Sequence, residues 1–523
     1  MKKPNIIIVM TDQQRAELRR GCGYALDTMP FLDQFARDGV DFSRAYTPNP
    51  TCMPARVSMF TGRYPSCHHV RTNHNVMDAL YTRDLLDVLK ENGYRTALCG
   101  KNHSHHQPED FDFSEACGHL GYEGEENSTP EQIAFADFLR ATNHMETHVP
   151  SPGGVEVQHP YRNVSSALRF IDSCDRDQPF FAWVSFAEPH NPNQVPEPYF
   201  DMFPPESLPP LHTSIADLAE KGARYPWLRG VWDKVLGEDI ERRILRARSN
   251  YPGMLRLIDD QFRRLVMGLE ERGLRQNTLV IFLSDHGDYV GEYGLLRKGV
   301  ELPEVLTRVT MAWQGPGVRA GVLDDTHCVS LVDVLPTLCG MLNTETPFGV
   351  QGRDLGALLR GEAPPAGEFD VGYAENGYGG LYWRPQDALR YADDRCFTDG
   401  KTFQCMSSWT LSGQMRMARK GDYKIQTDMM GNVKLFCLRD DPAELHNLWP
   451  DAAPERVKTD MLLALNTAML RADDPLPAPH NRYRTKVHPR GYWQDSAYLA
   501  QDPGVRMTPY GDCACHNEHK KEK

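Results

Sequence analysis

The sequence lacks any apolar run that approaches the roughly 20 residues needed for a membrane-spanning helix. The apolar run at residues 6–10 is also too short for the core of a secretory signal, and Asp12 ends it. Internal repeats and low-complexity tracts are absent, apart from a charged stretch at residues 519–523. We therefore expect a cytoplasmic protein that has no membrane partner.

A disulfide framework is missing as well. The 13 cysteines are odd in number and scattered along the chain, without the regular spacing of a disulfide-bonded scaffold. Reduced thiols are the simplest account of this pattern. The cluster Cys513-Ala514-Cys515-His516 has no second ligand pair of the kind that zinc sites use, so a surface tail is the expectation there.

Positive charge is not in excess. The chain holds 58 Lys and Arg against 71 Asp and Glu, a formal charge of −13, which argues against nucleic acid or an anionic membrane as the main partner. An anionic substrate is still compatible, because a local metal and a few cations override the overall field. A length of 523 residues suits one large domain and a smaller one.

Four apolar, β-branched or aromatic runs predict buried strands of a parallel sheet, at residues 5–10, 95–99, 179–186 and 278–284. Helical patterns separate them at 30–39, with Asp27 or Thr28 as cap, at 82–93, with a threonine cap, and at 251–273. Strands that alternate with helices predict an α/β fold, a large mostly parallel sheet sandwiched by helices.

The C-terminal part follows a different pattern. Residues 361–367 are rich in Gly and Pro and form the best candidate linker. Short strands are predicted at 416–425 and 434–438, followed by a helix at 454–469. We predict a catalytic domain at 1–365 and a smaller α+β subdomain with an antiparallel sheet at 366–523. Segments 104–160 and 191–250 show few regular periods and are predicted to be insertions around the site.

Hydrophilic side chains follow each predicted strand of the main sheet. They are, in chain order, Asp12 and Gln13, Lys101 and His103, His190, and Asp285 and His286. In open α/β sheets, ligands bind beyond the carboxyl ends of the strands. We therefore expect these groups to meet at one edge of the sheet.

Cys52 begins a short motif, Cys52-Met53-Pro54-Ala55-Arg56, of the form Cys-x-Pro-x-Arg. A helix is predicted to open at Cys52 and to close at Gly62. With this motif and the strand-end residues, the chain resembles the type I sulfatases of the alkaline-phosphatase superfamily. Further blocks fall in the family's order, among them residues 100–103, 187–190, 284–288, 331–333 and 435–448.

The resemblance implies that a maturase oxidises Cys52 to formylglycine (3-oxoalanine). It also implies one divalent cation held by Asp12, Gln13, Asp285, His286 and an oxygen of modified Cys52. Mostly oxygen ligands suit a hard cation, with Ca²⁺ as the first expectation and Mg²⁺ or Mn²⁺ as alternatives. Gln13 stands where the commonest family pattern has a second aspartate, which lowers the charge of the site by one unit.

The hydrated aldehyde is a gem-diol, which supplies the nucleophile. By the same resemblance, Arg56 holds the diol, and Lys101 and Lys298 bind the sulfate oxygens. Arg297 competes with Lys298 for that assignment, being its neighbour in the chain.

Two histidines are expected to move protons. His103 resembles the base that collapses the hemiacetal, and His190 the acid that protonates the departing alcohol and contacts the substrate. His105 and His106 lie close to His103 in the chain and complicate that assignment. Asn73 is expected to make a polar contact to the anion or the metal shell.

Hydrolysis of a sulfate monoester by the formylglycine diol is the leading hypothesis, with a small-molecule or saccharide ester as substrate. The alternative is a phosphonate monoester or phosphodiester hydrolase that uses the same site. A catalytically silent binding protein is a third reading, but it predicts loss of chemical residues that this chain retains. A sulfated sugar is expected from family analogy alone.

Overall fold

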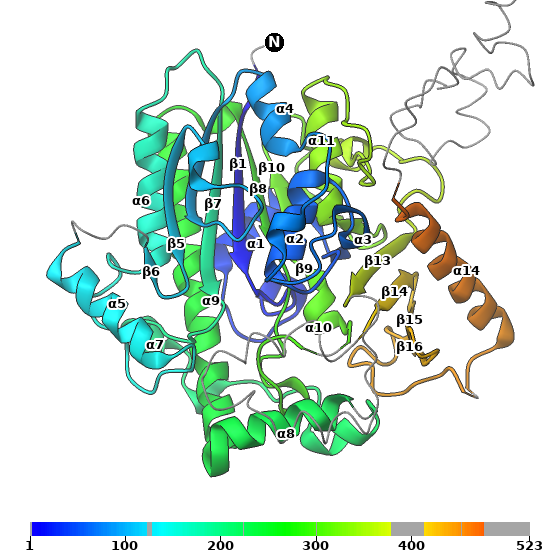
Figure 1. The fold of residues 1–523 in the computed structure, drawn as a ribbon. Coiled ribbons are helices and arrows are strands. Elements are labelled where there is room, and N and C mark those ends of the chain that lie inside the picture. The colour runs from blue at the N-terminus through cyan, green and yellow to red at the C-terminus, as the bar shows by residue number, and fades with distance from the viewer. Residues whose placement is uncertain are drawn as a thin grey trace, which may run out of the picture.

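The computed structural model describes residues 3–122, 128–222, 224–299, 301–377, 413–450 and 452–474. In these ranges the chain forms a large mixed sheet between layers of helices, with a separate antiparallel sheet nearby (Figure 1). The predicted fold class is confirmed.

The strands of the large sheet are, in spatial order, β11 (Val322–Asp324), β2 (Val40–Phe42), β10 (Met311–Gln314), β8 (Thr278–Ser284), β1 (Asn5–Asp12), β7 (Phe180–Pro189), β4 (Arg95–Lys101), β5 (Phe113–Gly118) and β6 (Gly121–Tyr122). From β8 to β5 all neighbours are parallel. Strand β10 runs antiparallel to β8 and β2, and β6 runs antiparallel to β5. The four predicted strands correspond to β1, β4, β7 and β8.

Alternation along β1 builds the core on both faces, because successive side chains of a strand point to opposite sides. Ile6, Ile8 and Met10 pack with α2 (Cys52–Thr61), α4 (Leu85–Glu91) and α11 (Val334–Met341). Ile7 and Val9 pack with α1 (Pro30–Arg37), α6 (His159–Asp172) and α9 (Ile240–Glu271). Both faces of the sheet are therefore covered (Figure 1).

The second sheet consists of β13 (Val371–Asn376), β14 (Met415–Lys420), β15 (Tyr423–Asp428) and β16 (Val433–Cys437), all antiparallel, with α14 (Glu455–Arg471) packed on it. The single strand predicted at 416–425 is in fact two, because the chain turns at Gly421, whose φ is +59°. A small sheet of β3 (Ala45–Tyr46), β9 (Arg308–Val309) and β12 (Val329–Ser330) lies between the two larger ones.

The segments predicted to be irregular contain regular elements. Residues 104–160 include β5 and β6, which extend the main sheet, and α5 (Pro130–Thr142). Residues 191–250 include α7 (Tyr199–Met202), α8 (Arg224–Leu236) and the first turns of α9. The remaining short helices are α3 (Pro65–His68), α10 (Glu304–Thr307) and α12 (Gly356–Leu359).

Two predicted helix starts are wrong, and so is the predicted cap of a third helix, α1, which begins at Pro30 as expected. Helix α9 begins at Ile240 rather than at 251. Its apolar stripe continues on the N-terminal side of Pro252, which lies inside the helix. Helix α4 is capped by Asp84, whose side chain accepts hydrogen bonds from Leu86 and Asp87 N–H, not by a threonine. Helix α1 has Met29 at its N-cap and no local side-chain cap.

The first turn of α1 is capped from another helix. The carboxylate of Asp259, on α9, accepts hydrogen bonds from the N–H groups of Phe31 at 2.8 Å and Leu32 at 2.7 Å. Two orphan donors of a helix start are thus satisfied by a residue far along the chain.

Residues 361–367 separate α12 from β13, and the domain boundary placed at 365 stays a prediction. The Cys513–His516 cluster lies outside the described residues. The cysteines that the structure describes are all free. No helix within the described ranges is both long and apolar enough to span a bilayer.

Candidate active site

The polar strand-end residues meet at one edge of the main sheet. Strands β8, β1, β7 and β4 are parallel neighbours, so their carboxyl ends lie side by side. Asp12 ends β1, Lys101 ends β4, and Asp285 directly follows β8. Gly100 lets β4 approach β7 closely here, because its φ is +112° and an added Cβ would lie 2.1 Å from the Ser185 carbonyl oxygen.

Cys52 occupies the first turn of α2 and is fully buried. The helix opens at Cys52 and closes at Gly62, whose φ of +63° is left-handed, as the sequence predicted. Asn73 accepts a hydrogen bond from Met53 N–H at 3.0 Å and so satisfies one donor of the helix start. Its predicted contact to the anion or metal shell stays a prediction.

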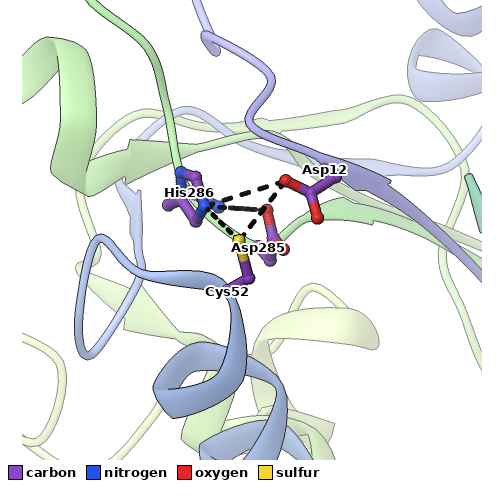
Figure 2. A group of neighbouring side chains, drawn as sticks. All are labelled: Asp12, Cys52, Asp285 and His286. Carbon is purple, nitrogen blue, oxygen red and sulfur yellow. Dashed lines mark hydrogen bonds and ion pairs between the residues drawn. The ribbon is translucent and has the colours of Figure 1, made fainter. Parts of the chain in front are cut away.

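Four buried side chains converge beside this helix: Asp12, Cys52, Asp285 and His286 (Figure 2). The Cys52 Sγ lies 3.6 Å from Asp12 Oδ1 and 3.3 Å from His286 Nε2. His286 Nε2 is in turn 3.9 Å from Asp12 Oδ1 and 3.8 Å from Asp285 Oδ1. The His286 Nδ1 lies 2.9 Å from the Gly287 carbonyl oxygen, so a proton held there leaves Nε2 free to act as a ligand.

The donor set fits a divalent cation. Burial raises the pKa of Asp285, and the negative charge of Asp12 raises it further. Burial also acts to raise the pKa of Asp12, but Lys101 and Arg56 outweigh it and hold that pKa well below its usual range. A dication among the two carboxylates and the imidazole would offset their repulsion, and these are donors that hard and borderline cations accept.

Arg56 bridges the carboxylates of Asp12 and Asp285. Its Nε donates to Asp285 Oδ2 at 2.9 Å, and its terminal nitrogens donate to Asp12 Oδ2 at 3.0 Å and to Ser185 Oγ at 2.8 Å. The guanidinium thus orients the oxygens that face Cys52. Its predicted role as a contact to the modified residue stays a prediction.

Gln13 is fixed by two charged neighbours. Lys298 Nζ donates to Gln13 Oε1 at 2.8 Å and lies 3.4 Å from Cys52 Sγ. The amide nitrogen of Gln13 donates to Asp288 Oδ2 at 2.5 Å. Asp288, which was not assigned a role from the sequence, therefore orients the amide that replaces the family's second aspartate.

The model of the family described as Sulfatase matches residues 4–344. The chain belongs to the sulfatase family. It is a sulfuric ester hydrolase of the alkaline-phosphatase superfamily. Membership implies a metal and a formylglycine at Cys52, so the Cys52 Sγ stands in for the oxygens of the modified residue in this sulfatase.

One curated relative and one solved structure illustrate what the chain is similar to. An arylsulfatase of Clostridium perfringens is 30% identical over 389 residues, which cover 68% of this chain and 78% of the relative. The structure of a phosphonate monoester hydrolase of Agrobacterium radiobacter matches with a TM-score of 0.72 at 22% identity and covers 94% of this chain and 99% of that one.

A third similar structure holds a sulfated sugar. The protein BT4656, solved in complex with its substrate D-glucosamine-2-N,6-O-disulfate, matches with a TM-score of 0.69 at 18% identity and covers 92% of this chain and 100% of that one. Both structural likenesses show the fold.

The charge of Lys101 acts on both predicted catalytic histidines of the sulfatase, His103 and His190. Lys101 pairs with Asp12, and its Nζ lies 2.8 Å from His119 Nε2. Burial together with the charge of Lys101 lowers the pKa of the His103 imidazole, while its interaction with Cys52 acts to raise that pKa. Burial and then Lys298 hold the pKa of His190 well below its usual range, and its Nδ1 lies 2.6 Å from the Asn191 carbonyl oxygen.

His119 is a site residue that the sequence analysis missed. It follows β5 directly, stacks on His190 with ring centroids 3.8 Å apart, and contacts Lys101. The strand-end rule would have found it, had residues 113–118 been recognised as a strand. Their polar Ser114 and Glu115 concealed the apolar pattern on which that recognition depends.

The competing candidates point elsewhere. Arg297 donates to the His144 carbonyl oxygen and lies over the Trp232 ring, so Lys298 is the neighbour that reaches Cys52. His105 and His106 both turn toward Asp84 and away from the strand-end cluster.

Proposed function

We propose that this sulfatase hydrolyses a sulfate monoester on a carbohydrate, with Cys52 oxidised to formylglycine by a maturase. We further propose Ca²⁺ as the cation, held by Asp12, Gln13, Asp285 and His286. The observation that carries the proposal is the convergence of cations and histidines on the buried position of residue 52, beside paired carboxylates.

The formylglycine hydrate would supply two hydroxyl groups. The oxygen of one attacks sulfur with loss of the alcohol, and the other, on losing its proton, becomes the aldehyde oxygen while the bond from carbon to the sulfated oxygen breaks and sulfate leaves. A bound cation would supply Lewis acidity that makes the attacking hydroxyl acidic near neutral pH. A thiol at Cys52 could not perform the second step, because it has no geminal hydroxyl.

Two ammonium groups would hold the sulfate. Lys298 reaches within 3.4 Å of Cys52 Sγ from the loop after β8, and Lys101 approaches from the end of β4. Because both are buried and already held by Gln13, Asp12 and other neighbours, they are preorganised for a tetrahedral anion on residue 52.

Two histidines would move protons. His103 interacts electrostatically with Cys52 and is suited to accept the proton that the second hydroxyl loses as sulfate leaves. His190 lies near Lys298 and is suited to protonate the departing alcohol once the negative charge of a bound sulfate offsets the cations that lower its pKa.

A sugar sulfate and Ca²⁺ are the finer parts of the proposal. The sugar is supported by likeness to the structure that binds D-glucosamine-2-N,6-O-disulfate. Ca²⁺ is supported by the excess of oxygen over nitrogen donors among the four protein ligands.

The test is a paired expression experiment. The chain is produced with and without a formylglycine-generating maturase, the peptide that contains Cys52 is weighed, and turnover is measured with 4-nitrophenyl sulfate, sulfated monosaccharides and a phosphonate monoester. We expect activity to track the aldehyde fraction and to favour the sulfates. A preference for the phosphonate would replace the substrate class, and full turnover by unmodified Cys52 would refute the mechanism.

Burial of the motif around Cys52 adds a second arm to this test. Cys52, Pro54 and Arg56 of the motif are all buried, so the maturase cannot reach them in the folded protein. Maturase added to folded, purified chain should leave the peptide mass unchanged, whereas co-expression should convert it. The Cys52→Ala variant serves as the inactive control for both arms.

A further inference from the structure

A second group of metal-ligating side chains lies outside the active site: Asp84, His105 and His106. The His105 Nε2 is 2.8 Å and the His106 Nε2 2.6 Å from the same oxygen, Asp84 Oδ2. The three side chains are 0%, 4% and 8% exposed, in that order. Two imidazole nitrogens and one carboxylate oxygen therefore converge at a single buried point.

The two carboxylate oxygens of Asp84 make different contacts. Oδ1 accepts hydrogen bonds from Leu86 N–H at 2.9 Å and Asp87 N–H at 3.2 Å, and so caps α4. Within the described residues, Oδ2 contacts the two histidines. A carboxylate with one oxygen fixed by backbone donors and the other directed at imidazoles has the arrangement of a metal ligand.

Asp84 forms a hydrogen bond with only one nitrogen of the two rings, His105 Nε2. In the described part of the chain, His106 Nε2 is buried and has no hydrogen-bond partner, although it lies near Asp84 Oδ2. His105 Nδ1 is also buried and lacks a partner there. The rings pack side by side, with centroids 4.2 Å apart. Buried polar atoms without partners are costly, and a ligand at the point of convergence would remove that cost for His106.

We propose that Asp84, His105 and His106 bind a zinc ion, with water as the fourth ligand. Two imidazoles and a carboxylate are a common donor set for Zn²⁺. Bonds of about 2.0–2.1 Å in a tetrahedron place the donors about 3.3 Å apart, so the distance from each imidazole nitrogen to Asp84 Oδ2 needs to widen by less than about 1 Å. Asp110 Oδ2 lies 3.6 Å from His106 Nδ1, where it can orient that ring from outside.

The zinc ion would fix the loop that carries His103. Asn102 donates to the His106 carbonyl oxygen at 2.7 Å and accepts from Ser104 Oγ at 2.7 Å, so residues 102–106 form one hydrogen-bonded unit. Arg56 donates to the Asn102 carbonyl oxygen at 3.2 Å on the active-site side. A metal on the other side would clamp this loop to α4.

The test uses the full chain, stripped of metal with a chelator and checked by elemental analysis. The apo protein is titrated with Co²⁺ as a spectroscopic probe, then with Zn²⁺ as competitor, in wild type, His106→Gln, Asp84→Asn and His286→Gln. Exposed His74 supplies the matched control, His74→Gln. Only variants whose far-UV circular dichroism matches wild type are compared. The readout is metal content and visible absorption, so it does not depend on the proposed reaction.

We expect His106→Gln and Asp84→Asn each to lose one equivalent of Zn²⁺ per chain and the corresponding cobalt bands. His286→Gln and His74→Gln should keep this equivalent of Zn²⁺ and the corresponding cobalt bands. Zn²⁺ should raise the thermal midpoint of His286→Gln and leave that of a His106→Gln/His286→Gln double variant unchanged. The proposal is overturned if His106→Gln binds as much Zn²⁺ as wild type, or if all bound Zn²⁺ disappears with His286→Gln alone.

Discussion

At the scale of single residues, the field around Cys52 favours negative charge. Burial and the charge of Asp12 both act to raise the pKa of the thiol. Lys101, Lys298 and His286 outweigh them and hold that pKa well below its usual range. The same cations would favour an oxyanion on the modified residue, so the site is charged for its proposed chemistry before substrate arrives.

His190→Ala should separate substrates by their leaving groups. If His190 protonates the departing alkoxide, alkyl and sugar sulfates should slow by roughly 10²–10⁴-fold, because their leaving groups need the proton. A 4-nitrophenyl ester should slow much less, since nitrophenolate leaves unassisted. Steady-state kinetics on both substrates measure the contrast, with His69→Ala, at an exposed histidine, as control. Equal damage to both substrates would show that the acid lies elsewhere.

His103→Ala should act on the second half of the reaction. Loss of the base that lets the hemiacetal collapse should slow sugar and nitrophenyl sulfates alike and let a sulfated enzyme accumulate. Intact mass after a burst of turnover detects that adduct. If no adduct forms and only the sugar ester slows, the two histidine roles are exchanged.

Asp285→Asn should weaken the cation rather than the fold. The change keeps the side-chain size but removes one of two carboxylates that face each other in the buried cluster. Activity of the matured enzyme should need more added Ca²⁺, Mg²⁺ or Mn²⁺ than wild type, and chelation should abolish it in both. Elemental analysis of exhaustively chelated wild type is the check, because a full rate without metal would disprove the assignment.

The strand-end rule predicted most of these residues, since a polar group after a buried strand can be recognised from the sequence alone. Contacts between groups from different strands could not be predicted in the same way. Arg56 donates hydrogen bonds to both carboxylates, and Gln13 donates one to Asp288. Both sets of contacts depend on the register of β1 against β8. His119 escaped because its strand carries polar residues.

At the scale of elements, α1 shows how tertiary contacts replace a local cap. Asp259 supplies the acceptors for its first turn, and burial raises the pKa of that carboxyl from 3.8 to about 7. The folded carboxyl thus binds a proton more tightly than the unfolded one. Its contribution to stability is fully present below about pH 4 and is lost as the pH rises through about 7.

Asp259→Asn should therefore change how stability depends on pH. The unfolding free energy of wild type relative to Asp259→Asn should fall between pH 5 and 7, by up to about 1.4 kcal/mol per pH unit, and level off above pH 8. Urea unfolding at four pH values measures this difference. Asp38→Asn, at an exposed carboxyl beside α1, should give a curve parallel to that of wild type. A constant difference for Asp259→Asn would contradict the shifted pKa.

Elements with a continuous apolar pattern were the ones that the sequence predicted well. Strand β1 carries apolar residues on both faces, and both faces are covered by helices. Helix starts were harder. Asp259 can be recognised as a cap only when α1 and α9 are placed in space, whereas Asp84 caps α4 through a local capping box with Asp87 that the threonine assignment overlooked. The start of α9 was predicted too late in the chain, because the helix runs through Pro252.

At the scale of the whole molecule, buried charge joins the two sheets. Glu304, on α10, pairs with Lys424 at 3.1 Å and Arg419 at 3.2 Å, both from the second sheet. Lys424 also pairs with Glu444 at 3.0 Å. Met415 and Met417 of the second sheet pack in one cluster with Tyr46, Leu302 and Cys328 of the main part. The described part of the second sheet is therefore anchored to the main part.

Lys424→Met should destabilise the entire chain rather than the second sheet alone. The change leaves Glu444 and Glu304 without a buried cation between them, and removing one partner of such a pair costs about 3–5 kcal/mol. Denaturant unfolding, followed by both fluorescence and circular dichroism, should show one shifted transition. Lys420→Met, at an exposed neighbouring lysine, should stay within about 0.5 kcal/mol of wild type. An early separate transition in Lys424→Met would show that the sheets unfold independently.

The order of strand and helix patterns predicted the fold class, but it did not predict how the two sheets are joined. The alternation of strands and helices indicated the main sheet, and short strands near residues 416–438 indicated a second one. Glu301 and Glu304 gave no sign of their partners in the second sheet, because ion pairs across more than 100 residues leave no local pattern. The cytoplasmic location and the boundary at residue 365 stay predictions.

The cap on α1 also bears on the order in which the chain is made. Phe31 and its capping carboxylate, Asp259, are 228 residues apart. A ribosome releases the N-terminal end first, so the growing chain holds α1 for about half of its synthesis before that acceptor exists. Over this interval the first turn lacks the acceptor that it has in the folded protein. Docking of α9 is therefore the event that completes α1, and the N-terminal half of the chain cannot reach its final form ahead of it.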